Sequence, residues 1–472
     1  MHPSQGRTRL AANPRELDAA IAVTRFGLGA QPGEIAAARP DPRGWLKAQI
    51  RPSGAETFDT GGETSAVRLA EFRAYRRARV MAESADGGGA DPAEAVRRFV
   101  RENAVGDVQN RIRLALQSPA GFRERWALFW ANHFTVSAVR IQVATLVGPY
   151  ENEAIRPRVF GRFADLLAAA ETHPAMLLYL DQAQSVGPNS RAARVRNRAG
   201  AGRPAGLNEN LAREILELHT VGIDGGYTQA DVTEFARALT GLSLARPDEP
   251  ATADPVVFRA PAHEPGGRTV MGRHYPDSGE AQATAILADL ASHPQTARFV
   301  CRKIARHFVA DDPPPALTAR LEAAWLASGG DLARVAEALV DAPEAWDARP
   351  SKFKTPYEFV VSSYRALGGA PRGPQVSQAL NTLGQRPFGA PSPKGWPDDA
   401  APWAASDALV KRMQVAQALG AAAGPRVAEP ASLAEAALGA RLTPASAAAI
   451  RRAESRAEAV ALLLMTPEFQ RR

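Results

Sequence analysis

The feature that most constrains the fold of this chain is the recurrence of helix starts in which a small polar residue precedes a proline. Asn13-Pro14, Ser118-Pro119 and Thr466-Pro467 have this form. A small polar residue caps the free N–H groups of a helix N-terminus, and proline suits the first helical turn because it has no N–H to satisfy. Apolar residues then recur at helical spacing. The pattern predicts a mainly α-helical, multi-helical protein.

Helical spacing continues along most of the chain, whereas strand signals are sparse. Residues 256–259 and 269–271 could pair as a small hairpin across the turn at 261–267. The loop at 246–255 is the best boundary between two lobes.

The first expected helix is stopped by Gly27. Further helices are expected at about 64–81, 92–117, 119–135, 150–172, 208–220, 228–241, 279–291, 294–309, 315–328, 331–341, 353–367, 405–421 and 443–465.

These elements predict a two-lobed molecule that forms one domain overall. An N-terminal helical lobe covers residues 13–245, and a loop and hairpin connection covers 246–278, with at most a small β-hairpin near 255–272. A C-terminal helical lobe covers residues 279–472. The irregular segment 384–403 is dense in Pro and Gly and carries Trp396 and Trp403. Such segments usually wrap a surface and are anchored by their aromatic side chains.

The charge balance is basic but does not favour nucleic acid as a ligand. The net charge is +7, from 57 Lys and Arg against 50 Asp and Glu. A basic chain ordinarily suggests a polyanionic partner. Only six of the basic residues are lysines, so nearly all the positive charge is arginine. A composition rich in Ala and Arg more often reflects a GC-rich genome than a ligand.

The single cysteine and the absence of long apolar runs bear on which metal sites the chain could form and on where in the cell it is expected. Cys301 is the only cysteine, so the chain forms no internal disulfide and no zinc site built from several thiolates. Charged residues interrupt every apolar run in residues 1–30, so a signal peptide is not expected. No other segment approaches the ~20 apolar residues that cross a bilayer. We expect a soluble, cytoplasmic protein with no export signal of its own.

The expected helix at 208–220 has an unusually polar face. Asn210, Arg213, Glu214 and Glu217 share it at helical spacing, which brings two carboxylates one turn apart. The pair could bind a divalent metal with a further ligand from another helix, or could divide into acid and base roles if burial separated their pKa values. The alternative is a solvated face in which Arg213 pairs with Glu209 or Glu217.

Three histidines are candidates for a site, each with a structural alternative. His133 ends the aromatic stripe of the helix at 119–135, where it is either a hydrogen-bonded core residue or a ligand-facing catalytic group. His263 lies in a turn rich in Pro and Gly, where it is either exposed and available or bonded to local backbone. His219 falls on the opposite side of its helical wheel from Glu214 and Glu217, so it does not complete a set of three ligands with them.

Two further patterns could bind an anion. Residues 190–203 concentrate arginines, including Arg194 and Arg196, in an expected flexible loop just before the acidic helix. The loop could close over an anionic substrate, or it could be a solvated insertion. Thr228 and Asp231 form an acidic capping box after a glycine turn. We favour a structural cap over a phosphate site there, because the motif lacks the lysine and the preceding strand of a P-loop.

Ordered blocks along nearly the whole chain resemble one family. They include TRFGLGAQPGE at 24–34, ERWALFWANHFTVS at 124–137, NENLARE at 208–214, HPQTARFVCRKIARHFVADDPPP at 293–315 and APSPKGWPDD at 390–399. The chain is similar in these blocks to the family catalogued as domain of unknown function 1800 (DUF1800). Two positions depart from the pattern: members often carry Trp where Leu242 stands and His where Ala131 stands.

The resemblance implies a partner rather than a reaction. Members of this family are commonly encoded beside a second family, domain of unknown function 1501 (DUF1501), which looks like the alkaline-phosphatase and sulfatase superfamily and often carries an export signal. An accessory or partner-binding protein is therefore the first expectation, and a folded complex could be exported on the signal of the partner. The alternative is a hydrolase or transferase whose site combines Glu214, Glu217 and Asn210 with His133 and His263.

Overall fold

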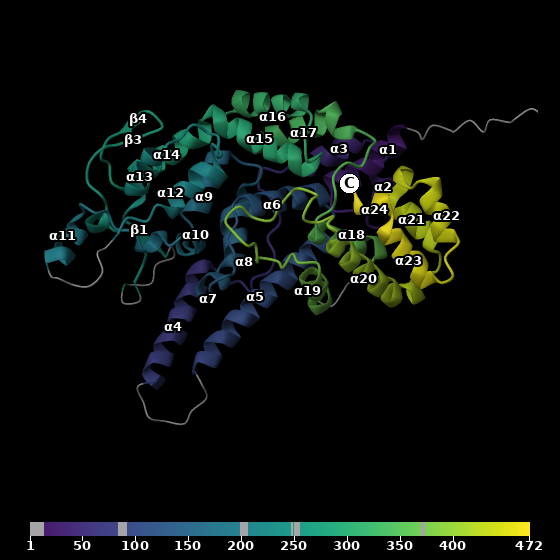
Figure 1. Cartoon of the computed structure of the whole chain (residues 1–472), viewed down its shortest axis with the longest axis horizontal. Coiled ribbons are helices and arrows are strands. Elements are labelled where there is room, and N and C mark those ends of the chain that lie inside the picture. Colours follow the sequence, from purple (N-terminus) through teal and green to yellow (C-terminus); the bar gives the residue numbers. More distant parts are fainter. Residues whose placement is uncertain (1–13, 84–91, 199–205, 247–248, 250–254, 370–372) are drawn as a thin grey trace, which may run out of the picture.

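The computed structural model describes residues 14–83, 92–198, 206–246, 249, 255–369 and 373–472. It confirms the mainly α-helical class, with short strands confined to two antiparallel pairs among the described residues (Figure 1). No helix in these ranges is both long and apolar enough to cross a membrane. The division into lobes at 246–278 stays a prediction.

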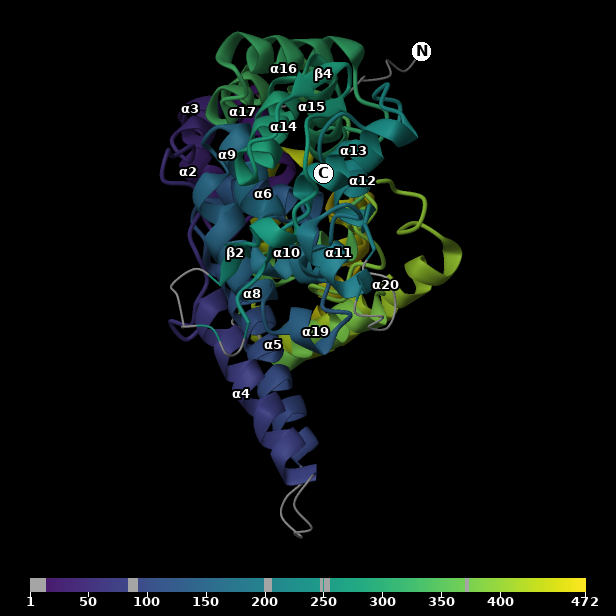
Figure 2. The same cartoon turned by 90° about the vertical axis from the view of Figure 1, so that its left-hand side faces the viewer.

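The first half of the chain contains short helices and one long hairpin. Its helices are α1 (Pro14–Ile21), α2 (Glu34–Ala38), α3 (Pro42–Lys47), α4 (Ser65–Glu83), α5 (Pro92–Gln117), α6 (Gly121–His133), α7 (Ile141–Ala144), α8 (Val147–Tyr150), α9 (Phe163–Glu171), α10 (Pro174–Tyr179), α11 (Arg191–Arg198), α12 (Asn210–Glu214) and α13 (Gln229–Leu239). The antiparallel pair α4 and α5 projects from the body as an arm (Figures 1 and 2).

The second half packs its helices more regularly. They are α14 (Glu280–Ser292), α15 (Pro294–Phe308), α16 (Pro315–Ser328), α17 (Leu332–Asp341), α18 (Pro356–Leu367), α19 (Gly373–Thr382), α20 (Ser406–Ala423), α21 (Pro430–Leu438), α22 (Pro444–Arg451), α23 (Arg456–Met465) and α24 (Pro467–Gln470). Figure 1 shows α14 to α17 along one side of the body and α20 to α24 at another.

Several helix starts have the expected chemistry. Thr466 accepts a hydrogen bond from the N–H of Phe469, with Pro467 in the first helical turn. Thr228 and Asp231 form the expected capping box of α13. Asn13 lies outside the described residues. At Ser118 the prediction is early by two residues, because its hydroxyl caps the N–H of Ala120 and α6 begins only at Gly121.

Two expected helices are interrupted. The helix expected at 150–172 is instead a π turn (Glu151–Ile155), a 3₁₀ turn (Arg156–Arg158) and then α9. Pro157 has no N–H to donate and its ring clashes with a continuing α-helix, so the break has a local cause. The helix expected at 443–465 divides into α22 and α23, and Ser455 caps the second by accepting from the N–H of Glu458.

The strand pairing differs from the expected hairpin. β2 (Val256–Phe258) pairs with β1 (Leu242–Leu244), and β3 (Arg268–Val270) pairs with β4 (Arg273–Tyr275). Met271 and Gly272 both have positive φ, as a two-residue hairpin turn of the favoured hand requires. This tight turn closes β3 on β4, so the predicted pairing of 256–259 with 269–271 is wrong.

The core is centred on α6, whose aromatic stripe is buried as expected. Trp126 packs against Phe122, Phe160 and Phe308, with ring centroids 5.8–6.1 Å apart. Phe308 belongs to α15, so this cluster joins elements from both halves of the chain. Cys301, also on α15, is fully buried, and burial raises the pKa of its thiol. The α6–α15 contact fixes the position of the polar groups at the ends of both helices.

Candidate functional site

The predicted acidic face lies at the surface of α12 and of the π turn that follows it. Glu214 and Glu217 are both partly buried, and the Tyr227 hydroxyl donates to Glu217 Oε2 at 3.4 Å. Arg213 pairs with Glu209 at 3.1 Å, which is one of the two pairings expected for a solvated face. Asn210 is exposed, and its backbone N–H donates to Asn208 Oδ1. Most contacts on this surface are therefore those of a solvated helix face, but one carboxylate has a shifted pKa.

That carboxylate is Glu214. Burial raises its pKa above the usual value, the charge of His219 acts in the opposite direction, and the nearby charge of Glu217 raises it further. Burial, with a contribution from Glu214, also raises the pKa of the Tyr179 hydroxyl to about 12. A carboxylic acid whose proton is held more tightly can act as a proton donor nearer neutral pH. Glu214 is therefore the member of the pair with the more unusual chemistry.

The π turn Ile215–His219 changes the predicted position of His219. A π turn contains more residues per turn than an α-helix, so an α-helical wheel fails beyond Glu214. His219 is fully buried, its Nδ1 lies 2.8 Å from Glu171 Oε1, and its charge acts on Glu214. The Glu171 contact has an ion-pair distance without hydrogen-bond alignment. His219 is thus buried beside Glu171, whereas Glu214 and Glu217 are only partly buried, and the expectation that it does not complete a set of three ligands with them stays a prediction.

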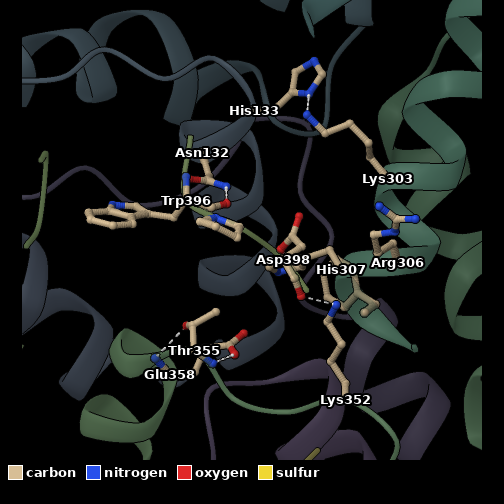
Figure 3. Close-up of polar contacts among 12 residues, drawn as sticks. Asn132, His133, Lys303, Arg306, His307, Lys352, Thr355, Glu358, Trp396 and Asp398 are labelled. Atoms are coloured by element: carbon tan, nitrogen blue, oxygen red, sulfur yellow. Dashed lines mark hydrogen bonds and ion pairs between the residues drawn. The ribbon is translucent and has the colours of Figure 1, made fainter. Parts of the chain in front are cut away.

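His133 connects this region with α15. Its Nε2 lies 3.1 Å from the backbone oxygen of His219, and its Nδ1 lies 2.9 Å from Lys303 Nζ (Figure 3). Burial, and then the charge of Lys303, lower the pKa of His133 well below its usual value. Nδ1 therefore accepts from the ammonium group, and Nε2–H donates to the carbonyl. Both ring nitrogens are occupied, which matches the expected hydrogen-bonded core histidine.

Lys303, the last residue in this series of contacts, has an amine whose pKa is unusually low. Burial lowers the pKa of Lys303 to about 8; Asp398 acts in the opposite direction, and Lys394 and Arg306 lower the pKa further. Its aliphatic stem also places the ammonium 5.5 Å from the centre of the Phe299 ring. The series of contacts from His219 through His133 therefore ends at Lys303, whose ammonium group interacts electrostatically with Asp398.

The remaining predicted site residues lie elsewhere. His263 is buried rather than exposed, and its Nδ1 bonds to the backbone oxygen of Thr240 at 2.8 Å, so the alternative of a backbone-bonded turn histidine holds. Arg194 and Arg196 are exposed on helix α11, where a flexible loop was expected. Eight residues with strong helical amphipathicity account for that helix. The part of the expected loop at 199–205 lies outside the described residues.

The described residues do not form a metal site around the acidic pair. No three His, Cys, Asp or Glu side chains within these ranges come together in an arrangement that could hold a metal ion. A divalent cation at Glu214 and Glu217 would need backbone or water oxygens to complete its coordination, because Ca²⁺ and Mg²⁺ take six or more oxygen ligands.

A second polar region forms where the segment 384–403 covers the end of α6. The Asn132 amide donates to the backbone oxygen of Trp396 at 3.0 Å and accepts from its N–H at 2.8 Å (Figure 3). Gly395 has φ +82°, and a Cβ there would lie 2.5 Å from the backbone oxygen of Asn132, so no other residue fits. Trp403 donates to the Pro397 oxygen at 2.9 Å. The segment wraps a surface as expected.

This wrapping forms one wall of a partly open cavity of about 80 Å³, which we call the chamber. Because a buried water needs roughly 10–15 Å³ on this measure, the chamber has room for several waters or one small ion. A smaller cavity of about 50 Å³ shares three of its walls, Arg111, Asn132 and Trp396. The chamber is lined by Leu28, Arg111, Arg125, Leu128, Asn132, His307, Thr355, Tyr357, Glu358, Gln385, Pro387, Trp396, Pro397 and Asp398.

An aspartate and a histidine form the most organised pair in the chamber. His307 Nδ1 lies 2.8 Å from Asp398 Oδ1, and the His307 Nε2 has no hydrogen-bond partner among the described residues (Figure 3). Burial lowers the pKa of His307, although Asp398 acts against this. Burial would raise the pKa of Asp398, but His307, Lys352 and Lys303 hold it below its usual value. The pair is therefore a carboxylate that orients a neutral imidazole.

Arginines surround the other acid of the chamber. Glu358 accepts from Arg125, lies 2.9 Å from Arg472 Nη2 and accepts from the N–H of Thr355 as part of the capping box of α18. Burial opposes the ionisation of Glu358, but Arg125 and Arg472 lower its pKa below the usual value. Burial, followed by the charge of Arg472, lowers the pKa of Arg125 to about 9. The single negative charge of Glu358 therefore compensates only part of the positive charge of Arg125 and Arg472.

Sequence reasoning missed His307, Asp398 and Tyr357. All three have signals in the sequence, because His307 and Asp398 lie in two of the blocks that carry the family resemblance and Tyr357 follows the helix start at Thr355–Pro356. Their meeting depends on a contact between residues 91 positions apart. No spacing rule along a single helix or strand predicts such a contact.

The fold and these sites define a class: a mainly α-helical protein with a half-buried acidic surface and a partly open chamber lined by charged residues. A family model described as "Protein of unknown function (DUF1800)" matches residues 21–471, and the chain belongs to this family. Neither the curated proteins nor the solved structures contain a significant match.

Proposed function

We propose that this protein is an accessory protein that binds a second protein. The observation that carries the proposal is an open groove of about 540 Å³ at the base of the α4–α5 arm. Val105, Val108 and Phe388 contribute to its largely apolar lining, and Val105 is 47% exposed. Exposed apolar patches of this kind mark interaction sites more often than chance, because water-facing apolar surface is unfavourable.

The lining of the groove suggests the chemistry of its occupant. Arg101 and Arg386 line it and are both exposed, so they offer positive charge beside the apolar surface. An apolar segment flanked by acidic residues would complement both features. The family resemblance supports one partner, a protein of the DUF1501 family related to phosphatases and sulfatases. Export on the signal of that partner is part of the same proposal.

Co-expression of both proteins, with a tag on the DUF1501 protein, is expected to recover a complex of the two. Val105→Asp should weaken binding about tenfold or more, because it places a charge in the apolar contact. Val195→Asp is the matched control, since Val195 is 59% exposed and lies on α11, away from the arm in Figure 1. Binding should be measured by calorimetry on the purified pair. Separate elution of the two proteins, or equal loss in both variants, would contradict the proposal.

A second candidate is a hydrolase or transferase that uses the acidic surface of residues 208–219. The raised pKa of Glu214, caused first by burial, is the observation that favours it. His133 belongs to the same chain of contacts but has both nitrogens occupied, so it would position His219 rather than react. His263 and the α11 arginines Arg194 and Arg196 are not brought to this surface by any contact described above.

The double substitution Glu214→Gln and Glu217→Gln tests that candidate. We expect it to raise the free energy of unfolding by up to about 1 kcal/mol, because it removes two close like charges, one of them partly buried. We also expect it to abolish any stabilisation by Mg²⁺, Mn²⁺, Ca²⁺ or Zn²⁺, which for a cation at 100 times its Kd would be about 2.7 kcal/mol. Thermal melts with and without each ion provide the measurement.

Glu337→Gln is the control for this double variant, because Glu337 is a surface acid paired with Arg334 on α17. It should change the melts by less than about 0.5 kcal/mol. If the double variant melts like this control and the wild type shows no response to any ion, the two glutamates form an ordinary solvated pair, and a metal-dependent enzyme at this surface is ruled out.

A further inference from the structure

We propose that the chamber behind the Asn132–Trp396 contact is a binding site for a phosphate group, either free phosphate or the phosphate of a small monoester. The proposal goes beyond partner binding and does not depend on it. It rests on the unpaired polar atoms that line the chamber, on the kind of hydrogen bond that each can make, and on the charge around them.

The first argument is that the chamber contains unused hydrogen-bond donors. Tyr357 is 8% exposed, and its hydroxyl has no hydrogen-bond partner among the described residues. Arg125 is 2% exposed, and its Nε has none either, although its two terminal nitrogens donate to Gly27 and Glu358. Nearly all buried polar atoms in folded proteins are paired, so unpaired ones in a cavity wall indicate a bound water or ion.

The second argument is charge. Arg125 and Arg472 share the single carboxylate of Glu358. His307 is neutral when it donates to Asp398, and the charges of Lys352 and Lys303 also act on Asp398, although the Lys352 ammonium forms its ion pair with Asp311 at 2.6 Å. The excess of positive charge therefore lies at Glu358, where two buried arginines meet one carboxylate. A bound anion would compensate the excess, and arginine guanidinium groups suit phosphate particularly well.

The third argument selects phosphate among anions. When His307 Nδ1–H donates to Asp398, Nε2 carries a lone pair and can only accept a hydrogen bond. A hydrogen phosphate ion, or the monoanion of a phosphate monoester, has a P–OH group that can donate to it. Sulfate has no such proton at neutral pH and would place an oxygen lone pair against that of Nε2. The chamber thus combines donors for anionic oxygens with one acceptor for a protonated oxygen.

The size of the chamber agrees with this ligand. A volume of about 80 Å³ admits a group of phosphate size and is too small to hold a whole nucleotide. The neighbouring cavity of about 50 Å³ behind the shared wall of Arg111, Asn132 and Trp396 could receive the small alcohol part of a monoester. Free phosphate and the monoanion of a monoester therefore present the same chemistry to Tyr357, Arg125 and His307. Because the second pKa of a monoester is about 6, only a minority of it is the monoanion at pH 7, and a bound monoester would also use the second cavity.

The test is calorimetric titration of the full chain with inorganic phosphate, with sulfate and with phosphoserine at pH 7 and constant ionic strength. We expect phosphate to bind at least tenfold more tightly than sulfate. Phosphoserine that binds as well as phosphate would assign the site to monoesters, whereas phosphoserine that is excluded would assign it to the free ion. Equal affinities for phosphate and sulfate, or no binding of phosphate at 10 mM, would overturn the proposal.

Two substitutions locate the binding. Tyr357→Phe removes only an unpaired hydroxyl, so a purely structural Tyr357 should tolerate it, and we expect phosphate affinity to fall about tenfold because a hydrogen bond to a charged group is lost. His307→Asn keeps an N–H for Asp398 but removes the Nε2 acceptor, and it should abolish the preference for phosphate over sulfate. Tyr364→Phe, outside the chamber, is the matched control. Unchanged phosphate affinity in both chamber variants, with unchanged circular dichroism, would refute the site.

Discussion

Arg156→Met is expected to lower the free energy of unfolding by about 3–5 kcal/mol, because it leaves the buried Glu124 carboxylate without a counter-charge and leaves Glu151 with Arg111 alone. Arg156 is fully buried and donates to Glu124 through Nη1 and Nη2, both at 2.8 Å, and to Glu151 through Nε at 2.9 Å. Burial acts against its charged form, but Glu124 and then Glu151 raise the pKa of Arg156 above the ordinary value. Urea unfolding at pH 7 measures the loss.

Companion variants test whether the loss comes from the unpaired negative charge. The triple variant with Glu124→Gln and Glu151→Gln should recover most of the loss at pH 7, since neither buried carboxylate then remains. Arg320→Met, at the exposed pair with Glu344, should cost less than about 1 kcal/mol. A similar loss in both single variants would show that the buried triad has no special role.

Trp126→Ala is expected to cost about 3–5 kcal/mol, because it removes the ring around which the α6 and α15 aromatic side chains pack. The ring is fully buried, lies parallel to Phe160 and contacts Phe308 from the other half of the chain. Its Nε1–H also donates to the backbone oxygen of Val159 at 2.6 Å, which would lose this partner. Chemical denaturation followed by circular dichroism measures the effect.

Two companions separate packing from the hydrogen bond. Trp126→Phe keeps most of the apolar contact but leaves the Val159 oxygen unpaired, so it should cost about 1–3 kcal/mol. Leu326→Ala changes a side chain that is 48% exposed and should cost less than about 0.5 kcal/mol. Near-wild-type stability of Trp126→Ala would mean that the aromatic cluster does not couple α6 with α15.

The local features of this fold were readable from the sequence. The helices expected at 92–117 and 315–328 have the observed bounds, and the capping boxes that start α13 and α18 are formed by residues three positions apart. Such features depend on the backbone needs of a few neighbouring residues, which sequence spacing reports directly. The buried aromatic stripe of α6 was predicted for the same reason, since it depends only on helical periodicity.

The candidate site was readable only in part. The acidic pair and the core position of His133 follow from helical spacing. The contact of His219 with Glu171 does not, because Glu171 lies on another helix, α9. His263 was expected to be exposed in its turn but is buried against Thr240, a residue 23 positions earlier. Burial of a turn depends on what packs over it, and the turn sequence does not contain that information.

The sequence by itself determined the helical class, most helix starts and the family, because each depends on local chemistry repeated along the chain. Only the tertiary structure decided which polar groups meet. His133 reaches Lys303 across 170 residues, and His307 reaches Asp398 across 91. β2 pairs with β1 rather than with the segment at 269–271. These contacts arise where the aromatic packing of α6 against α15 and the wrapping of 384–403 bring distant segments together, and the free energy of such packing depends on the whole fold.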